Sequence, residues 1–218
     1  MAAQIISVVQ AADLIFNGAS VMVGGFLNAG SPNFILDELC RRPIKDLTVI
    51  ANDTSFVGKS LGNLVVNKQI SRFYVSHIGT NPETGRQMTS GEAEVNLIPQ
   101  GTLAERIRCA GFGLGGVLTP TGVGTPVQAD KQIVEVEGKK YLMELPLYAD
   151  IAIIKAYKAD KIGNLIYRGA ARNFNPLMAT AAKLVIAETE HIVETGEISP
   201  DEVITPSIFV DYLVMGKN

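Results

Sequence analysis

The residues with the clearest chemical potential lie between Asn17 and Pro32, where a short apolar run meets several glycines. Val21-Met22-Val23 has the apolar, β-branched character of a buried strand. Gly24-Gly25 follows, and there the backbone can adopt positive φ and approach a ligand without a Cβ in the way. Ser31-Pro32 then carries the residue types favoured at the N-cap and the first position of a helix. This order predicts backbone N–H groups that face an anion or a developing oxyanion.

Short strands alternate with helices along most of the chain, which predicts an α/β fold with a mostly parallel open sheet and flanking helices. Strands are predicted at 21–23, 47–51, 73–75, 95–98, 151–157, 165–167 and 184–187, and helices that begin at Ser7, Ser31, Ser60, Thr102 and Asn175. The sequence contains no internal repeat and no interdomain linker. We therefore expect a single domain over residues 1–218.

Three segments depart from this alternation of strands and helices. The polar stretch from 79 to 91 predicts a long loop with little regular structure. Residues 111–125 contain six glycines and one proline, too many turn-forming residues for regular structure. Apolar runs at 133–136 and 141–145 flank Glu137-Gly138-Lys139 and predict a β-hairpin. The expected fold therefore includes a glycine-rich loop and a β-hairpin that leave the sheet.

The composition is typical of a soluble globular protein, with 47% apolar and 19% charged residues. A net charge of -3 gives no basic surface for nucleic acid. No apolar run approaches the ~20 residues that span a bilayer, and the first residues lack the regions of a signal peptide. Two distant cysteines and two distant histidines predict neither a disulfide framework nor a metal site. We expect a cytoplasmic protein that binds neither nucleic acid nor membranes.

Two glycine motifs share a pattern with nucleotide-binding loops but lack the context. Residues 111–116 fit GxGxxG, yet a predicted helix precedes them where the dinucleotide motif needs a strand. The segment from Asp53 to Ser60 ends in Gly-Lys-Ser, as a P-loop does, but Asp53 replaces the first glycine. A carboxylate at that position would repel a phosphate. Neither motif predicts nucleotide binding.

The pattern GxSxG centred on Ser60 leaves a serine hydrolase as an alternative. That motif requires a sharp strand-to-helix turn, whereas a polar run separates Ser60 from the preceding predicted strand. His77 and His191 are the only histidines, and a triad in the usual order would need Asp150 or Asp160 beside His191. The alternative interpretation makes Ser60 the N-cap of the next helix and His77 a residue at a strand end.

The stretch from 17 to 32 also resembles a known signature. It reads Asn-Gly, two residues, three apolar residues, Gly-Gly-Phe, three residues, Gly, one residue, Pro. This pattern is similar to that of the first subunit of family I CoA-transferases. Segments 51–54, 76–79, 99–102 and 171–175 extend the resemblance, which points to the alpha subunits of bacterial acetate or acetoacetate CoA-transferases.

The resemblance implies an enzyme that moves CoA between a short-chain acyl-CoA and a carboxylic acid of the acetate, acetoacetate or butyrate type. Such enzymes follow a ping-pong mechanism with a nucleophilic Glu in a Ser-Glu-Asn-Gly motif. This motif is absent from the 218 residues, so the resemblance assigns the Glu to a beta subunit, in a heterodimer or an α2β2 assembly. Glu92 has no specific context and is predicted to be solvated or structural. CoA is expected as a substrate, with no permanently bound cofactor.

The resemblance also assigns roles to individual residues. The CoA-proximal loop of the family corresponds to Gly24, Gly25, Phe26, Leu27, Asn28, Ala29 and Gly30. Asn52 corresponds to an Asn in a strand-end loop of the family, and Gln100 to a Gln that donates to the acyl or thioester carbonyl. Asp53 stands where some relatives have an amide, so its contact is left open. A non-catalytic sugar-phosphate-binding module on a similar fold is a second alternative.

Overall fold

Strands and helices alternate along the chain, whose residues 2–216 are described by a computed structural model. The elements are β1 (Gln4–Ile6), α1 (Val8–Asp13), β2 (Ser20–Val23), α2 (Asn33–Cys40), β3 (Leu47–Asp53), α3 (Leu61–Val66), β4 (Ile70–His77), α4 (Pro82–Ser90), β5 (Glu94–Leu97), α5 (Gln100–Gly111), β6 (Val117–Thr119), β7 (Ile133–Val136), β8 (Lys139–Glu144), β9 (Ala149–Asp160), β10 (Leu165–Ile166), the 3-10 helix η2 (Gly169–Arg172), α6 (Asn175–Thr180), β11 (Ala182–Val193) and β12 (Tyr212–Met215).

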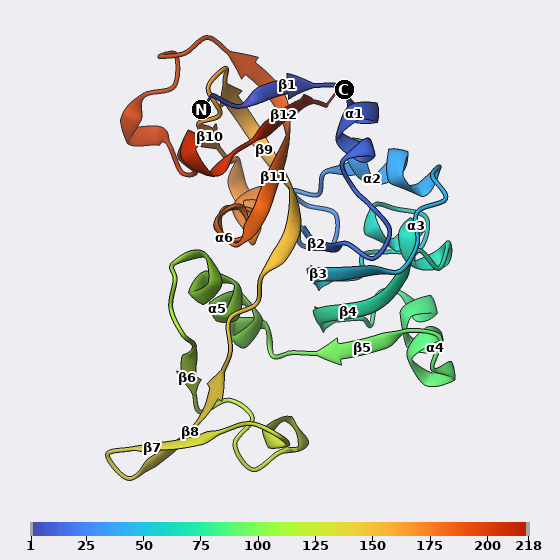
Figure 1. Ribbon diagram of the computed structural model, residues 1–218, viewed down its shortest axis with the longest axis vertical. Coiled ribbons are helices and arrows are strands. Elements are labelled where there is room, and N and C mark those ends of the chain that lie inside the picture. The colour runs from blue at the N-terminus through green and yellow to red at the C-terminus, as the bar shows by residue number, and fades with distance from the viewer. Residues whose placement is uncertain (1, 217–218) are drawn as a thin grey trace.

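The main sheet has nine strands in the order β1-β12-β11-β9-β2-β3-β4-β5, with β10 beside β9 (Figure 1). All neighbours are parallel except the β9–β10 pair, which confirms the mostly parallel α/β fold. From β2, the next three strands of the chain add on one side, while β9, β11 and β12 lie on the other. The β2–β9 junction is therefore a topological switch point, where ligands commonly bind beyond the carboxyl ends of the strands.

Two apolar layers hold the helices against the sheet. Val21 and Val23 of β2 pack with α1, α2 and α3 on one face, whereas Met22 packs with α5 and α6 on the other. The central strands are thus buried on both sides, which explains why their sequences are continuous apolar runs. None of the helices between residues 2 and 216 combines the length and apolarity required to cross a bilayer.

The predicted β-hairpin is confirmed and belongs to a second, three-stranded antiparallel sheet with the order β6-β8-β7. Its strands extend away from the main sheet (Figure 1). Glu137 and Gly138 both have positive φ, at 52° and 74°, as a two-residue type I′ turn requires. The prediction of no regular structure at 111–125 is wrong at Val117–Thr119, because these residues pair with β8.

The predicted long loop at 79–91 is wrong, because this segment contains α4. The Asn81 side chain accepts a hydrogen bond from the Glu83 N–H, and Pro82 occupies the first helical position. Gly91 ends the helix in the left-handed conformation. The helix buries Thr84 and Gln87 rather than apolar residues. The sequence of α4 therefore lacks apolar residues at helical spacing, although it has the capping residues that mark the start and the end of a helix.

Four predicted helix starts can be compared with the structure through their capping contacts. Ser7 forms the expected capping box with Gln10. Ser31 does not cap α2, which begins after Pro32 without a side-chain cap. Thr102 lies inside α5, and Asn175 lies inside α6 with Phe174 at the N-cap. The Asn175 side chain instead hydrogen bonds to the Lys155 N–H and the Gly30 carbonyl.

Candidate functional site

The residues implied by the family resemblance gather at the carboxyl edge of the main sheet. The glycine loop, residues 24–30, follows β2, Asn52 and Asp53 end β3, and Gln100 begins α5 after β5. Gln100 Nε2 donates to Asn52 Oδ1 at 2.7 Å. Asn52 Nδ2 and the Leu27 N–H both donate to Asp53 Oδ2, each at 2.7 Å. One hydrogen-bonded chain thus connects Gln100 to the tip of the glycine loop.

The glycine loop is a tight backbone turn. Phe26 and Ala29 exchange two backbone hydrogen bonds of 3.0 and 2.9 Å. Leu27, between them, has a φ of 55°, an unusual value for a side-chain-bearing residue. Within residues 2–216, the N–H groups of Gly25 and Asn28 have no acceptor. These two N–H groups could donate to a ligand.

Two glycines of the loop are required by close neighbours, Asn175 and Ala171. A Cβ on Gly24 would lie 1.8 Å from Asn175 Oδ1, and a Cβ on Gly30 would lie 2.5 Å from the Ala171 carbonyl oxygen. Asn175 Oδ1 accepts from the Lys155 N–H at 2.9 Å, and its Nδ2 donates to the Gly30 carbonyl at 3.0 Å. Asn175 therefore ties the loop to β9, which the sequence alone did not reveal.

The N-terminus of α2 does not offer the free N–H groups that the sequence predicted. The N–H groups of Phe34 and Ile35 donate to Glu188 Oε2 at 2.9 and 3.1 Å. Lys155 Nζ lies 3.2 Å from Glu188 Oε1. Burial raises the pKa of the Glu188 carboxyl, and Lys155 and the two N–H groups oppose that shift. A carboxylate of the same chain thus already occupies the positive end of this helix.

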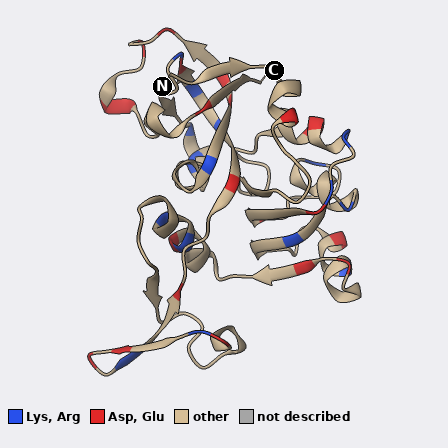
Figure 2. Cartoon of the chain, viewed as in Figure 1, with Lys and Arg blue, Asp and Glu red and all other residues tan. Residues whose placement is uncertain are grey.

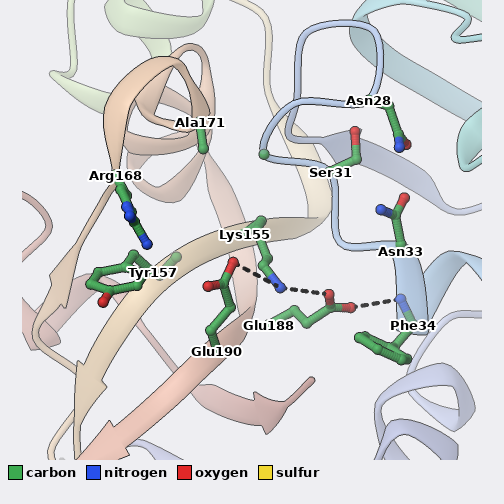
Figure 3. A pocket seen from close by; sticks show the side chains of 12 residues that line it. Asn28, Ser31, Asn33, Phe34, Lys155, Tyr157, Arg168, Ala171, Glu188 and Glu190 are labelled. Atoms are coloured by element: carbon green, nitrogen blue, oxygen red, sulfur yellow. Dashed lines mark hydrogen bonds and ion pairs between the residues drawn. The ribbon is translucent and has the colours of Figure 1, made fainter. Parts of the chain in front are cut away.

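A polar cavity of about 530 Å³ adjoins the glycine loop on its β9 side (Figure 3). Figure 3 shows Lys155 between Glu188 and Glu190, with Arg168 and Tyr157 to one side and Asn28 and Ser31 to the other. The Arg168 guanidinium lies 5.3 Å from the centre of the Tyr157 ring, over its face. Four separate stretches of sequence line this cavity, so no single local motif predicts it.

Asn52 and Asp53 are buried, with 2% and 5% of their surfaces exposed, whereas Gln100 is exposed. Ser76 Oγ lies 2.7 Å from the Asn52 carbonyl oxygen and 3.0 Å from Asn52 Oδ1. The Ser55 N–H donates to Asp53 Oδ1 at 2.8 Å. A rigid, buried pair thus holds one exposed side-chain amide at the surface of the site.

Ser60 lacks the surroundings of a hydrolase nucleophile. Its Oγ is buried and has no hydrogen-bond partner among the described residues. His77 lies exposed at the end of β4. The His191 ring instead packs against the Tyr157 ring in a T-shaped arrangement, with 5.2 Å between the two ring centres. Ser60 also does not cap α3 through its side chain. Neither the triad nor the capping interpretation is supported.

The remaining polar candidates lie elsewhere or lack their context. Glu92 lies two residues before β5, at the amino edge of the sheet, and pairs with Arg86 and Lys68. The Arg86 hydrogen bond holds the pKa of Glu92 far below its usual range. The glycines at 111–116 begin with the last residue of helix α5 and are not preceded by a strand. Among residues 2–216, no group of three or more potential ligands could hold a metal ion. Lys and Arg are interspersed with Asp and Glu along the elements in Figure 2.

The comparison with known proteins adds an independent line of information. The profile described as Coenzyme A transferase matches residues 5–216. The chain is 51% identical over 201 residues to the acetate CoA-transferase subunit alpha of Escherichia coli (strain K12), covering 92% of this chain and 91% of that relative. It is 46% identical over 198 residues to the acetoacetyl-CoA:acetate/butyrate CoA transferase alpha subunit of Clostridium acetobutylicum, covering 91% of each.

The fold is also found among solved structures. A crystal structure of an acyl-CoA transferase from Escherichia coli O157:H7 superposes with a TM-score of 0.85 at 20% identity. The match covers 99% of this chain and 47% of that one, so the present chain spans about half of its length. At this identity the likeness is one of fold.

Proposed function

The chain belongs to the coenzyme A transferase family, and from this membership we propose that it is the alpha subunit of a two-subunit CoA-transferase. The complex transfers CoA between a short-chain acyl-CoA and a carboxylic acid of the acetate, acetoacetate or butyrate type. This substrate class follows the names of the two relatives. CoA is bound as a substrate, and the partner is a beta subunit.

The chemistry begins with attack of a Glu carboxylate on the thioester carbonyl of acyl-CoA, which forms an acyl anhydride and releases the CoA thiolate. The thiolate then attacks the Glu carbonyl of the anhydride, releasing the first acid and leaving a Glu–CoA thioester. The second acid reverses these steps and leaves as its acyl-CoA. Each attack places negative charge on a carbonyl oxygen, so preorganised N–H donors would accelerate it.

This chain would supply those donors from Gln100 and the glycine loop. The observation that carries the proposal is the hydrogen-bonded chain from Gln100 through Asn52 and Asp53 to Leu27. It fixes an exposed amide relative to a loop with free N–H groups at the carboxyl edge of the sheet. Gly24 to Gly30 and Asn52 form the CoA-proximal wall in this proposal.

The nucleophilic Glu belongs to the beta subunit in this proposal. This sequence contains no Ser-Glu-Asn-Gly. Among the glutamates beside the loop, Glu188 is engaged by Lys155 and two backbone N–H groups. Glu190 is freer, because its side chain is 34% exposed and lies 3.9 Å from Lys155 Nζ. Glu190 is therefore the residue on this chain that the experiment must test.

The first experiment compares the purified chain with the complex formed by co-expression with its beta subunit. We expect transfer of CoA from acetyl-CoA to acetoacetate or butyrate only by the complex, with parallel double-reciprocal plots because CoA remains on the enzyme between half-reactions. Full turnover by the single chain would refute the division of labour. A complex that hydrolyses acyl-CoA without transferring CoA would refute the transferase proposal.

The second experiment locates the covalent thioester. The complex is loaded with acyl-CoA, reduced with borohydride and mapped by peptide mass spectrometry. We expect the reduced Glu on the beta subunit and an unchanged adduct yield in Glu190→Gln. Reduction of Glu190, together with loss of the adduct in Glu190→Gln, would move the nucleophile to this chain.

A further inference from the structure

Asp53 is the one carboxylate in the hydrogen-bonded chain that reaches Gln100. We propose that Asp53 is a positioning residue, which sets the direction of the Gln100 amide through Asn52 and holds the tip of the glycine loop through Leu27. The proposal rests on the proposed function in one respect, because the role of Gln100 as a donor to the reacting carbonyl belongs to that function.

The direction of the Gln100 amide follows from the chemistry of a carboxylate. An ionised carboxylate only accepts hydrogen bonds, so the Asn52 side chain must turn its Nδ2 toward Asp53. The Asn52 Oδ1 then faces Gln100, and Gln100 must present its Nε2 to it. One of the two hydrogen atoms on Gln100 Nε2 is donated to Asn52 Oδ1, and the other remains available for a substrate carbonyl. An amide at position 53 could both donate and accept. The side-chain amides of Asn52 and Gln100 could then each lie in either of the two flipped orientations and still form hydrogen bonds.

The second effect of Asp53 concerns the loop backbone. Leu27 has a φ of 55°, a strained conformation for a side-chain-bearing residue that persists only where its surroundings enforce it. The charge-assisted hydrogen bond from the Leu27 N–H to Asp53 Oδ2, at 2.7 Å, is such a constraint. The Ser55 N–H occupies the other oxygen of Asp53 at 2.8 Å. The carboxylate is therefore itself fixed on both oxygens.

The test uses Asp53→Asn in the complex with the beta subunit. An amide has one oxygen, so it cannot accept from Leu27, Asn52 and Ser55 together, although its size is unchanged. We expect kcat to fall about 10- to 100-fold, because the Gln100 amide N–H would no longer be aimed at the reacting carbonyl, and a small misplacement of a donor is costly at a reacting centre. The KM for acyl-CoA should change less than kcat. Wild-type kcat in Asp53→Asn would overturn the proposal.

A double-mutant cycle separates positioning from general destabilisation. If Asp53 acts through Gln100, Asp53→Asn should cost less in a Gln100→Ala background than in the wild type. Equal costs in the two backgrounds would overturn the action through Gln100. Asp150→Asn is the matched control, because Asp150 also accepts from a backbone N–H and a side chain but lies at the start of β9. It should leave kcat unchanged.

A measurement without turnover keeps the inference separate from the proposed function. Backbone hydrogen exchange at Leu27 should be at least about tenfold faster in Asp53→Asn than in the wild type or in Asp150→Asn. Unchanged exchange at Leu27 would overturn the loop contact even in an active transferase. Faster exchange in a complex that lacks transferase activity would support the contact and refute only the proposed function.

Discussion

Gly25 offers the most demanding test of the glycine loop, and the substitution Gly25→Ala is the smallest change that probes it. Its φ of 126° is a conformation that L residues rarely adopt, at a cost of about 1–3 kcal/mol. An added Cβ would also lie 2.3 Å from Ser31 Oγ and 3.3 Å from Ser31 Cα. Ser31 is buried just before α2, so it has little room to move. Together we expect a loss of about 2–4 kcal/mol in the free energy of unfolding.

The expected effect on catalysis is comparable in free energy to the effect on folding but is read out separately. If the Gly25 N–H donates to the reacting carbonyl, its displacement should lower kcat by about 10²- to 10³-fold, the typical cost of one oxyanion donor. Transfer from acetyl-CoA is measured on the complex, and urea unfolding is measured on the same preparation. Adding Ser31→Ala should recover part of the stability, because it removes the Oγ contact while the unusual φ remains.

Gly85→Ala is the matched control for the same added methyl group. A Cβ at Gly85, within α4, would meet no atom within 4 Å. We expect it to stabilise the protein by about 0.5–1 kcal/mol, because Ala loses less entropy in a helix than Gly. A folded Gly25→Ala complex with wild-type kcat would refute the role given to the glycine loop.

Three further outcomes are expected. Burial raises the pKa of Glu188 above its ordinary 4.5, so the folded state binds more protons than the unfolded state over the window above 4.5. Its contribution to stability is then complete below that pH and is lost as the pH rises through the folded pKa. In urea titrations, the free energy of unfolding of the wild type should therefore fall relative to that of Glu188→Gln as the pH rises above 4.5. A constant difference between the two proteins would contradict this. Burial, and secondarily Asp37, raises the pKa of Cys40 to about 11. Alkylation of Cys40 by iodoacetamide should therefore be slow at pH 8 and accelerate about tenfold per pH unit toward pH 11. Labelling of Cys40 at the rate of a free cysteine at pH 8 would disprove the raised pKa. Gln100→Ala should slow formation of the enzyme–CoA adduct about 10²-fold in rapid-quench assays without lowering Tm, since Gln100 is exposed; an unchanged rate would remove it from the site.

The fold could be predicted where the sequence signal is local and apolar. The runs around Val49, Val75 and Ile153 are buried on both faces of a parallel sheet, and their composition reveals this. β1 and β12 were not predicted, because three or four residues near an end of the sequence carry too little pattern. α4 was missed for the opposite reason, since it is long enough but buries Thr84 and Gln87.

The site was predictable only in part. The glycine turn and Gln100 could be placed through a local pattern, and their roles remain predictions. Their supports could not be placed, because Asn175 contacts the loop, and Glu188 the start of α2, from more than a hundred residues away in sequence. The residue type of Asn175 predicts a helix cap, but Phe174 occupies that position. Only the tertiary arrangement shows that the Asn175 amide serves β9 and the loop instead.

The placement of β1 has a consequence for how the protein is made. Among the residues that the structure describes, β1 pairs only with β12, with Gln4 opposite Tyr212, and β12 in turn lies between β1 and β11. On the ribosome, β1 therefore cannot form this pairing until Tyr212 has been synthesised and has left the exit tunnel. During synthesis, β11 exposes an unpaired edge at the same place, which is a template for association with other chains. A nascent chain that stalls before residue 212 should therefore be a preferred client of chaperones.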